Sequence, residues 1–402
     1  MLFHLILRRL VRRGTLLVRY PDGTEQRYGD GGAPAAAFAL TTRRAVRRMV
    51  SDPSLALGEL YMSGELVPLE CTVYDALDIF LHNLQSGQVH PMETGMRALR
   101  RLRRRVDQFN PAPRARRNVA HHYDLDDRLY SLFLDADRQY SCAYFETPSE
   151  TLEAAQAAKQ RHIAAKLHLH RPGLEVLDIG CGWGGMALTL ARDHGARVTG
   201  ITLSAEQLGV ARQRAAAAGL SDQVRFELMD YRAWSAPVDR VVSVGMFEHV
   251  GVNHYTTFFR SIRRMLRPGG VALVHAIGRA GGPGVTNPFL AKYIFPGGYL
   301  PALSEVLPAV ERSGLWTADL EVLRLHYALT LRHWRERFAA HRERIAAVYD
   351  ERFCRMFEFY LAGSEVAFRR ADHMVWQLQL CTAVGTLPIT RDYMLGGAPA
   401  GG

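Results

Sequence analysis

The chain has 402 residues, of which 48% are hydrophobic, and a formal net charge of +10. This length predicts two domains, or one domain with large additions, and a sizeable core. The positive charge favours anionic partners, either phospholipid surfaces or nucleic acid. The five cysteines are scattered without a CxxC pair, which argues against a zinc site and a disulfide framework and fits a reducing cytoplasm.

The N-terminal quarter of the sequence predicts a small mixed α+β domain over residues 1–96. Its first residues, MLFHLILRRLVRRG, are apolar and basic, and the apolar run is too short to span a membrane. We expect a helix here that lies against the protein or against a membrane surface. Residues 15–29 predict a hairpin, because two strand-like runs flank Pro21-Asp22-Gly23. Gly/Ala-rich residues and a helical region containing LALGELYMSGEL follow.

Residues 97–118 predict an arginine-rich linker. The stretch RALRRLRRRVDQFNPAPRARR contains one acidic residue and two prolines, so we place a domain boundary there. The linker is either a solvated connector or a contact for anionic lipid head groups, and nucleic acid is a third alternative. The larger domain is predicted over residues 119–390.

From about residue 174 the sequence alternates between strand-like and helix-like stretches. Strands are predicted over LEVLDIG, ARVTGITL, VRFELMDY, DRVVSVGMFEHV and VALVHAIG, and a later one over HMVWQLQLC. This rhythm indicates an α/β fold with a doubly wound, mostly parallel sheet. Two helical stretches, 328–349 and 350–371, are inserted late in the sequence, and we expect them to cap the site.

Ligands of such sheets bind at the carboxyl ends of the strands. The residues predicted at those ends are Asp178, Gly180, Gly182, Thr202, Leu203, Asp230, Tyr231, Glu248 and His275, and Gln207 follows the second strand by one helical turn. VLDIGCGWGG reads as a strand, a tight turn and a helix start, where a ligand can approach bare backbone amides. It lacks the GxxxxGK[ST] pattern of a phosphate loop and fits the dinucleotide pattern only loosely.

Four polar side chains are candidates for chemistry. Glu248 must face water, a partner or a ligand, because an unpaired buried carboxylate is costly. His275 ends an otherwise buried strand, where a lone histidine is more often structural. Together with Tyr327, these two residues could hold a small polar species or move a proton. Cys142 has no base adjacent in the sequence, so a backbone or packing role is favoured over a nucleophile.

These motifs resemble those of the cyclopropane-fatty-acyl-phospholipid synthase family, whose members depend on S-adenosylmethionine. The resemblance runs from about residue 15 to 385. It rests on HHYDLDDRLYSLFLDADRQYSCAYF, VLDIGCGWGG, GITLSAEQ, SVGMFEHVG, KYIFPGGYLP and RMFEFYLAGSEVAFR, in that order. The mycolic-acid cyclopropane synthases and the fatty-acyl C-methyltransferases share most of them.

The resemblance implies a seven-stranded Rossmann-like methyltransferase sheet with helical cap insertions. The implied S-adenosylmethionine-binding residues are Tyr140, Ser141, Asp178, Gly180, Gly182, Thr202, Leu203, Gln207, Asp230 and Tyr231. The resemblance also implies a bicarbonate ion, held by Glu248, His275 and Tyr327 and by the backbones of Cys142 and Ile277. It implies no metal.

The implied reaction is methyl transfer to the cis double bond of unsaturated acyl chains in membrane phospholipids. The methyl transfer leaves a carbocation on the acyl chain, and bicarbonate then removes a proton so that a cyclopropane ring closes. The alternatives are fatty-acyl C-methylation, giving a methylene or methyl branch, and a non-catalytic cofactor-binding protein at the membrane surface. A nucleic-acid methyltransferase is disfavoured, because strand four ends in FEHV rather than (D/N)PP(Y/F/W).

Two further expectations follow from the resemblance. In LAGSEVAFR, Ser364 stands where some members carry a cysteine, which the bicarbonate scheme does not need. The chain is expected to form a homodimer in the cytoplasm and to bind peripherally to the anionic inner face of the cell membrane, without a nucleic-acid partner.

Overall fold

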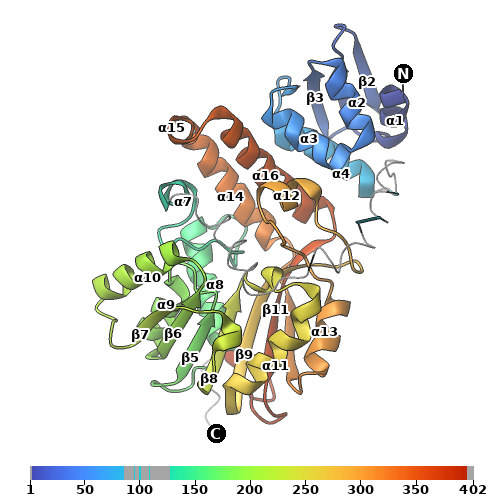
Figure 1. Cartoon of the computed structure of the whole chain (residues 1–402). Helices are drawn as coiled ribbons and strands as arrows, with labels where there is room; N and C mark the ends of the chain where they lie inside the picture. The colour runs from blue at the N-terminus through green and yellow to red at the C-terminus, as the bar shows by residue number, and fades with distance from the viewer. Residues whose placement is uncertain (1, 86–94, 96–98, 101–107, 109–126, 396–402) are drawn as a thin grey trace. The chain divides into compact units, whose positions relative to one another are not determined.

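The structure is a computed structural model that describes residues 2–85, 95, 99–100, 108 and 127–395 (Figure 1). It divides into two compact units, each built from three stretches of the chain. The first comprises Met1–Arg104, Val285–Pro296 and Tyr327–His373, and the second Arg105–Gly284, Gly297–His326 and Met374–Gly402. Most of the predicted linker 97–118 lies outside the described residues.

A four-stranded sheet in the order β2-β1-β3-β4 organises the first unit. Its strands are β1 (Thr15–Arg19), β2 (Glu25–Gly29), β3 (Ala35–Leu40) and β4 (Leu66–Pro68). β1 and β2 are antiparallel, so the predicted hairpin is confirmed. In its turn, Asp22 accepts hydrogen bonds from the amide and hydroxyl of Thr24, at 3.0 and 2.7 Å. The Gly/Ala-rich residues, which the sequence did not assign to a strand, form β3.

The helices of this unit come from all three of its stretches of chain. They are α1 (Leu2–Leu10), α2 (Arg43–Ser51), α3 (Pro53–Met62), α4 (Val73–Gln85), α12 (Pro288–Tyr293), α14 (His326–Ala340), α15 (Arg342–Val348) and α16 (Glu351–Arg370). α1 buries Phe3 and Leu7 in the core of this unit, so the N-terminal helix lies against the protein. Two late helices were predicted, but the structure has three, because the helical conformation is interrupted near His341 and again before Asp350. The Asp350 carboxylate caps α16 by accepting a hydrogen bond from the Phe353 amide.

Of the late helices, α16 packs on the N-terminal helices α3 and α4. Asp78 of α4 and Arg370 of α16 form a two-pronged ion pair at 2.8 and 3.2 Å. The Tyr61 hydroxyl of α3 donates to Glu358 of α16 at 2.8 Å. The first compact unit therefore joins N-terminal residues to stretches far along the chain. The division into residues 1–96 and 119–390 stays a prediction.

A seven-stranded sheet forms the second unit, in the order β10-β11-β9-β8-β5-β6-β7 (Figure 1). Its strands are β5 (Glu175–Ile179), β6 (Arg197–Thr202), β7 (Val224–Leu228), β8 (Val238–Val244), β9 (Leu266–Arg279), β10 (Trp316–Val322) and β11 (His373–Cys381). The pairs from β7 through β6, β5 and β8 to β9 are parallel, and β10 pairs antiparallel with β11. The predicted doubly wound, mostly parallel sheet is confirmed.

The helices of this unit precede its first strand or lie between its strands. They are α7 (Asp127–Phe133), α8 (Leu152–Lys166), α9 (Gly185–His194), α10 (Ala205–Ala217), α11 (Tyr255–Met265) and α13 (Leu303–Glu311). Among the described residues, no helix is both long enough and apolar enough to cross a membrane.

Two strand boundaries differ from the sequence prediction. β8 ends at Val244, because Gly245 takes a left-handed backbone with φ of 70°. Glu248 therefore lies in a short 3-10 turn, Phe247–His249, and not at the end of the strand itself. β9 begins at Leu266, before the predicted VALVHAIG strand, so it also includes Arg267–Gly270.

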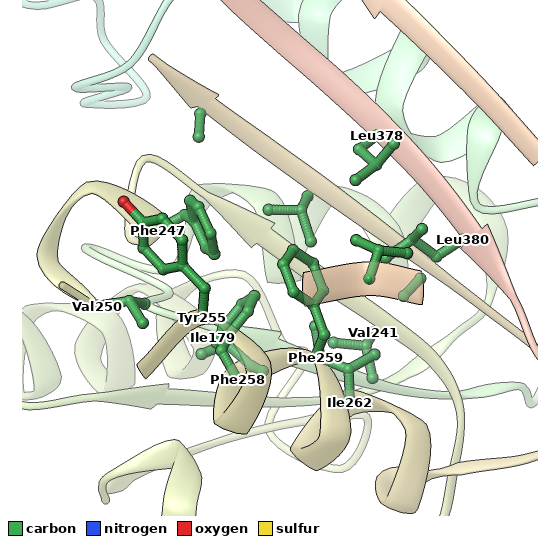
Figure 2. Packing of buried hydrophobic residues seen from close by; sticks show 14 of the residues in the cluster. Ile179, Val241, Phe247, Val250, Tyr255, Phe258, Phe259, Ile262, Leu378 and Leu380 are labelled. Atoms are coloured by element: carbon green, nitrogen blue, oxygen red, sulfur yellow. The ribbon is translucent and has the colours of Figure 1, made fainter. Parts of the chain in front are cut away.

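The main core of this unit lies between the sheet and α11 (Figure 2). The ring of Phe247 packs against Phe258 and Phe259 of α11, with centroids 5.2 and 5.4 Å apart. Val241 of β8 and Leu378 of β11 belong to the same cluster. This packing anchors the 3-10 turn that carries Glu248.

Replacing Phe259 with alanine is expected to destabilise the second unit by about 3–5 kcal/mol, because the ring is fully buried and its loss leaves a cavity. Urea unfolding followed by tryptophan fluorescence measures this. Leu228→Ala is the control, since that side chain is 53% exposed and its loss should change the free energy of unfolding by less than about 0.5 kcal/mol. Equal effects of the two substitutions would contradict this description of the core.

Candidate active site

A cavity of about 150 Å³ opens where β5, β6 and β8 end. The predicted cofactor-binding residues all line it: Tyr140, Ser141, Asp178, Gly180, Gly182, Thr202, Leu203, Gln207, Asp230 and Tyr231. Parallel strands of a doubly wound sheet present their carboxyl ends on one edge, which explains why residues so far apart in sequence converge. Cofactor binding by these residues stays a prediction.

The glycine-rich turn forms one wall of this cavity. Gly180 has φ of 82°, and a Cβ there would lie 2.9 Å from the Met246 Cβ, so only glycine fits without strain. The amides of Gly180 and Cys181 both donate to the Ile201 carbonyl, at 2.9 and 3.1 Å. The expectation of bare amides is therefore wrong for these two residues, whose N–H groups tie the turn to β6.

Asp178 brings a buried carboxylate to the cavity. Its Oδ2 atom is buried and has no hydrogen-bond partner. Burial raises the pKa of Asp178 to about 7, against the opposing effect of the Lys159 ammonium. An unpartnered acidic oxygen at a cavity wall suits a cationic ligand group, such as an ammonium.

Lys159 supports the facing loop. Its ammonium is fully buried and donates to the side-chain oxygen Oε1 of Gln139 and to the Ser141 hydroxyl, the latter at 2.9 Å. Burial lowers the pKa of Lys159 to about 8. Because Gln139 and Ser141 line the cavity, this lysine holds the loop against the site. The Tyr140 ring packs on Tyr130, with centroids 5.3 Å apart.

Further polar groups of the cavity wall follow the carboxyl ends of β6 and β7. The Thr202 hydroxyl donates to the Gln207 carbonyl oxygen at 3.1 Å, which leaves the two amide N–H donors of Gln207 for a ligand. Asp230 pairs with Arg232 through an Nε–Oδ1 contact of 2.8 Å. Arg232 also lines the cavity, so the acidic residue predicted here is paired with an arginine at the cavity wall.

Glu248 and Ile277 form a second cluster next to this cavity, since Met246 and His249, which flank Glu248, line the cavity. Glu248 Oε1 accepts a hydrogen bond from the Ile277 amide at 2.6 Å. Its Oε2 is buried and has no partner. Burial raises the pKa of Glu248 to about 7. The carboxylate thus presents an acceptor that only a ligand can use.

His275 lies two residues before Ile277 on β9, with its carbonyl accepting from the Gly245 amide at 2.9 Å. Its ring is buried, and Nδ1 lies 3.1 Å from the amide nitrogen of Gln377. Burial lowers the pKa of His275 to about 3, with further lowering from nearby cations. The imidazole is therefore neutral at physiological pH.

The remaining predicted site residues are Cys142 and Tyr327. Cys142 is buried, and its thiol donates to the Ala143 carbonyl at 3.3 Å. Tyr327 belongs to the first unit, where its ring packs on Phe368 with centroids 4.8 Å apart. Within the described residues, no cluster of three or more His, Cys, Asp or Glu side chains could hold a metal ion.

Sequence reasoning missed part of the cavity wall. The missed residues include Arg138, Gln139, Trp183, Met229, Arg232, Met246 and His249. Trp183 and Arg232 directly follow predicted site residues and could have been found by that adjacency. The methionines carry no sequence signal, because an apolar side chain at a strand end looks the same whether it packs in a core or lines a site.

Two family models match the chain. The model "Mycolic acid cyclopropane synthetase" covers residues 111–378, and a domain of unknown function, DUF7884, covers residues 2–81. The first spans well over half of the chain and includes the cavity and the Glu248 cluster. The second coincides with the N-terminal four-stranded sheet and its helices.

Curated relatives and solved structures point the same way. Cyclopropane-fatty-acyl-phospholipid synthase of Escherichia coli is 40% identical, over 87% of this chain and 88% of its own. Tuberculostearic acid methyltransferase UfaA1 of Mycobacterium tuberculosis is 37% identical, over 93% and 90%. The mycolic acid cyclopropane synthase CmaA1 complexed with SAH and CTAB aligns with a TM-score of 0.63 at 33% identity, covering 68% of this chain and all of that one. The chain therefore belongs to the mycolic acid cyclopropane synthetase family and is an S-adenosylmethionine-dependent methyltransferase, a homologue of cyclopropane-fatty-acyl-phospholipid synthase.

Proposed function

We propose that the chain transfers the methyl group of S-adenosylmethionine to the cis double bond of unsaturated phospholipid acyl chains and closes a cyclopropane ring. The observation that carries this proposal is the buried, unpartnered Oε2 of Glu248, next to a glycine-walled cavity. A methyl transfer to a hydroxyl or amine removes a proton already on a heteroatom. Ring closure requires a base for a carbon-bound proton, and the Glu248 cluster supplies a place for one.

The cavity residues fit S-adenosylmethionine, which when bound supplies an electrophilic methyl group. The orphaned Asp178 oxygen would accept from the ammonium of its amino-acid end. The free amide donors of Gln207 would contact the ribose hydroxyls. Lys159, through Gln139 and Ser141, would keep the loop closed over the cofactor.

The Glu248 cluster fits a bicarbonate ion, which when bound supplies the base. Glu248 in its carboxylate form would accept the O–H of the anion and so raise the basicity of its other oxygens. The neutral ring of His275 would donate to the anion. The Ile277 amide already donates to Glu248 Oε1, so it would orient that carboxylate. The Cys142 backbone and Tyr327 remain predicted contacts of the same ion. The surrounding aromatic core would exclude water, which otherwise turns a carbocation into an alcohol.

The proposed partner is an anionic phospholipid surface on the cytoplasmic face of the membrane, bound peripherally by a homodimer. The charge of +10 and the arginine-rich segment at 97–118 support electrostatic docking. Fatty-acyl C-methylation is the alternative, and it is favoured by one observation, the 37% identity with tuberculostearic acid methyltransferase over 93% of the chain.

The test is a reaction of the purified protein with S-adenosylmethionine, bicarbonate and liposomes of a monounsaturated anionic phospholipid. Released acyl chains are analysed by mass spectrometry and proton NMR. A gain of one CH2 unit with high-field ring protons is the expected result. The same gain with vinylic methylene signals would make the chain a C-methyltransferase. Cofactor binding without any gain would favour the non-catalytic alternative.

The glycine turn should be required for cofactor binding. Gly180→Ala is expected to weaken S-adenosylmethionine binding at least about tenfold, because the added Cβ combines left-handed strain with a clash against Met246. Isothermal titration calorimetry measures the affinity. Gly173→Ala is the control, since its φ is 75° but a Cβ there meets nothing within 4 Å. The control should lose stability through strain alone and keep its affinity, and a parallel loss of affinity in both variants would count against the assignment.

A further inference from the structure

The relevant feature is a buried chain of polar side chains that ends on His275. We propose that Lys166 and Gln377 are positioning residues, which hold His275 as a neutral imidazole with its proton on Nε2, so that it donates to the catalytic anion. The role of the anion rests on the function proposed above. The geometry of the chain itself stands independently of that function.

The first step is the orientation of the Gln377 amide. Lys166, the last residue of α8, is 2% exposed, and its ammonium donates to Gln377 Oε1 at 2.7 Å. The same ammonium also donates to the Glu321 carboxylate of β10, which His162 contacts at 2.6 Å. An ammonium has only donors, so the Gln377 oxygen must face it and the Gln377 NH2 must face away.

The second step is the proton on the His275 ring. The Gln377 NH2 lies 3.1 Å from His275 Nδ1. An amide nitrogen only donates, so Nδ1 must accept and carries no proton. A neutral imidazole has a single N–H, which must then be on Nε2. Because Lys166 prevents the Gln377 amide from turning over, the opposite tautomer would place two donors against each other.

The third step is the charge around the ring. Three groups of α8, the side chains of Lys159, Lys166 and His162, lower the pKa of His275, while Glu321 acts against them. Protonation at Nδ1 would also face the Gln377 NH2. His275 therefore stays a neutral donor over the whole physiological pH range. It orients the anion by hydrogen bonding and does not itself take up the proton released on ring closure.

This arrangement exceeds what folding needs. Burying the Lys166 ammonium and the Gln377 amide carries a desolvation cost that apolar side chains of similar volume would avoid. Lys166 contacts Gln377 of β11, the strand next to β9, and Gln377 in turn contacts His275 of β9. A role in fixing one tautomer of His275 would explain why these polar side chains are buried here.

The test replaces Gln377 with glutamate in protein labelled with 15N at histidine. The introduced carboxylate can only accept, so it should draw a proton onto His275 Nδ1. Two-bond 1H–15N spectra of the wild type should show His275 with an unprotonated Nδ1, assigned by comparison with His275→Asn. In Gln377→Glu, Nδ1 should become protonated. The KM for bicarbonate should rise about tenfold or more, with the S-adenosylmethionine affinity unchanged within about twofold.

Two further variants keep the test decisive. Gln379→Glu is the matched control, because it buries the same carboxylate two residues along β11, where Gln379 contacts the Lys166 backbone and Tyr393. Its His275 signals should match those of the wild type. If Gln377→Glu does not fold, Lys166→Met should instead release the amide and leave the two His275 tautomers mixed.

A wild-type spectrum with a proton on His275 Nδ1, or variants that leave the tautomer unchanged, would overturn the proposal. The NMR result does not depend on turnover. A wild type with the expected tautomer but without ring formation would leave the positioning role intact and reject the proposed function. Ring formation without the expected tautomer would support the proposed function and reject the positioning role.

Discussion

Replacing Glu248 with glutamine is expected to lower kcat for ring formation by about 10²–10⁴-fold, the usual effect of losing a group that assists proton transfer. The glutamine has the same shape, and its carbonyl oxygen can still accept from the Ile277 amide. The orphaned Oε2, however, becomes an NH2 group that donates, so it would oppose rather than strengthen a bound base. S-adenosylmethionine affinity should stay within about twofold, because Glu248 does not line the cofactor cavity.

The pH profile gives this prediction a second readout. Burial raises the pKa of Glu248 to about 7, and the proposed role needs the carboxylate. Below that pH the group is protonated and donates, so kcat/KM should fall as the pH decreases through about 7. The residual activity of Glu248→Gln should not show this decrease at low pH. The bicarbonate concentration must be held constant across the series, since bicarbonate itself titrates in this range.

Glu311→Gln is the control for the Glu248 substitution. Glu311 ends α13 and is exposed to solvent, so its replacement should leave both kcat and the pH profile unchanged. Wild-type turnover by Glu248→Gln would remove the basis for placing the base in this cluster. A loss of S-adenosylmethionine binding would instead mean that the substitution disturbed the neighbouring 3-10 turn.

The parallel core of the sheet could be predicted from sequence because each buried strand is a continuous apolar run followed by a helix signal. β10 could not, since its outer residues face solvent, including Trp316 at 54% exposure, and the strand lies at the edge of the sheet. The grouping of α16 with α4 was also missed. It depends on the pairing of Asp78 with Arg370, and no local pattern signals a contact between residues so far apart.

The candidate site shows the same limit. Asp178, Gly180 and Thr202 could be predicted to line one cavity because topology alone brings the strand ends together. Lys159 and Gln377 were not predicted, because each acts through another side chain and lies inside a stretch that otherwise packs. A lysine within LEAAQAAKQRHIAAK looks like a surface residue of an amphipathic helix, yet Lys159 is fully buried. Such supporting residues become visible only when the contacts are known.

The second large effect concerns Asp178, where stability and binding should change in opposite directions. Burial raises the pKa of Asp178 to about 7, well above that of an unfolded aspartate. Between about pH 4 and pH 7 the folded state therefore holds a proton that the unfolded state has lost, so the contribution of this group to stability declines as the pH rises. Relative to the wild type, Asp178→Asn should thus gain about 2–4 kcal/mol of stability across that range.

Binding should show the opposite sign, because the asparagine cannot offer a charged acceptor to the ammonium of S-adenosylmethionine. We expect the affinity to fall by about 10–100-fold, as for loss of a charge-assisted hydrogen bond. Thermal unfolding from pH 4 to pH 8 and calorimetric titration measure the two quantities. Asp222→Asn is the control, since Asp222 is exposed, and it should alter neither. If Asp178→Asn bound the cofactor as tightly as the wild type, the Asp178 carboxylate would not contact the cofactor ammonium. The carboxylate would then lower stability at neutral pH without contributing to cofactor affinity.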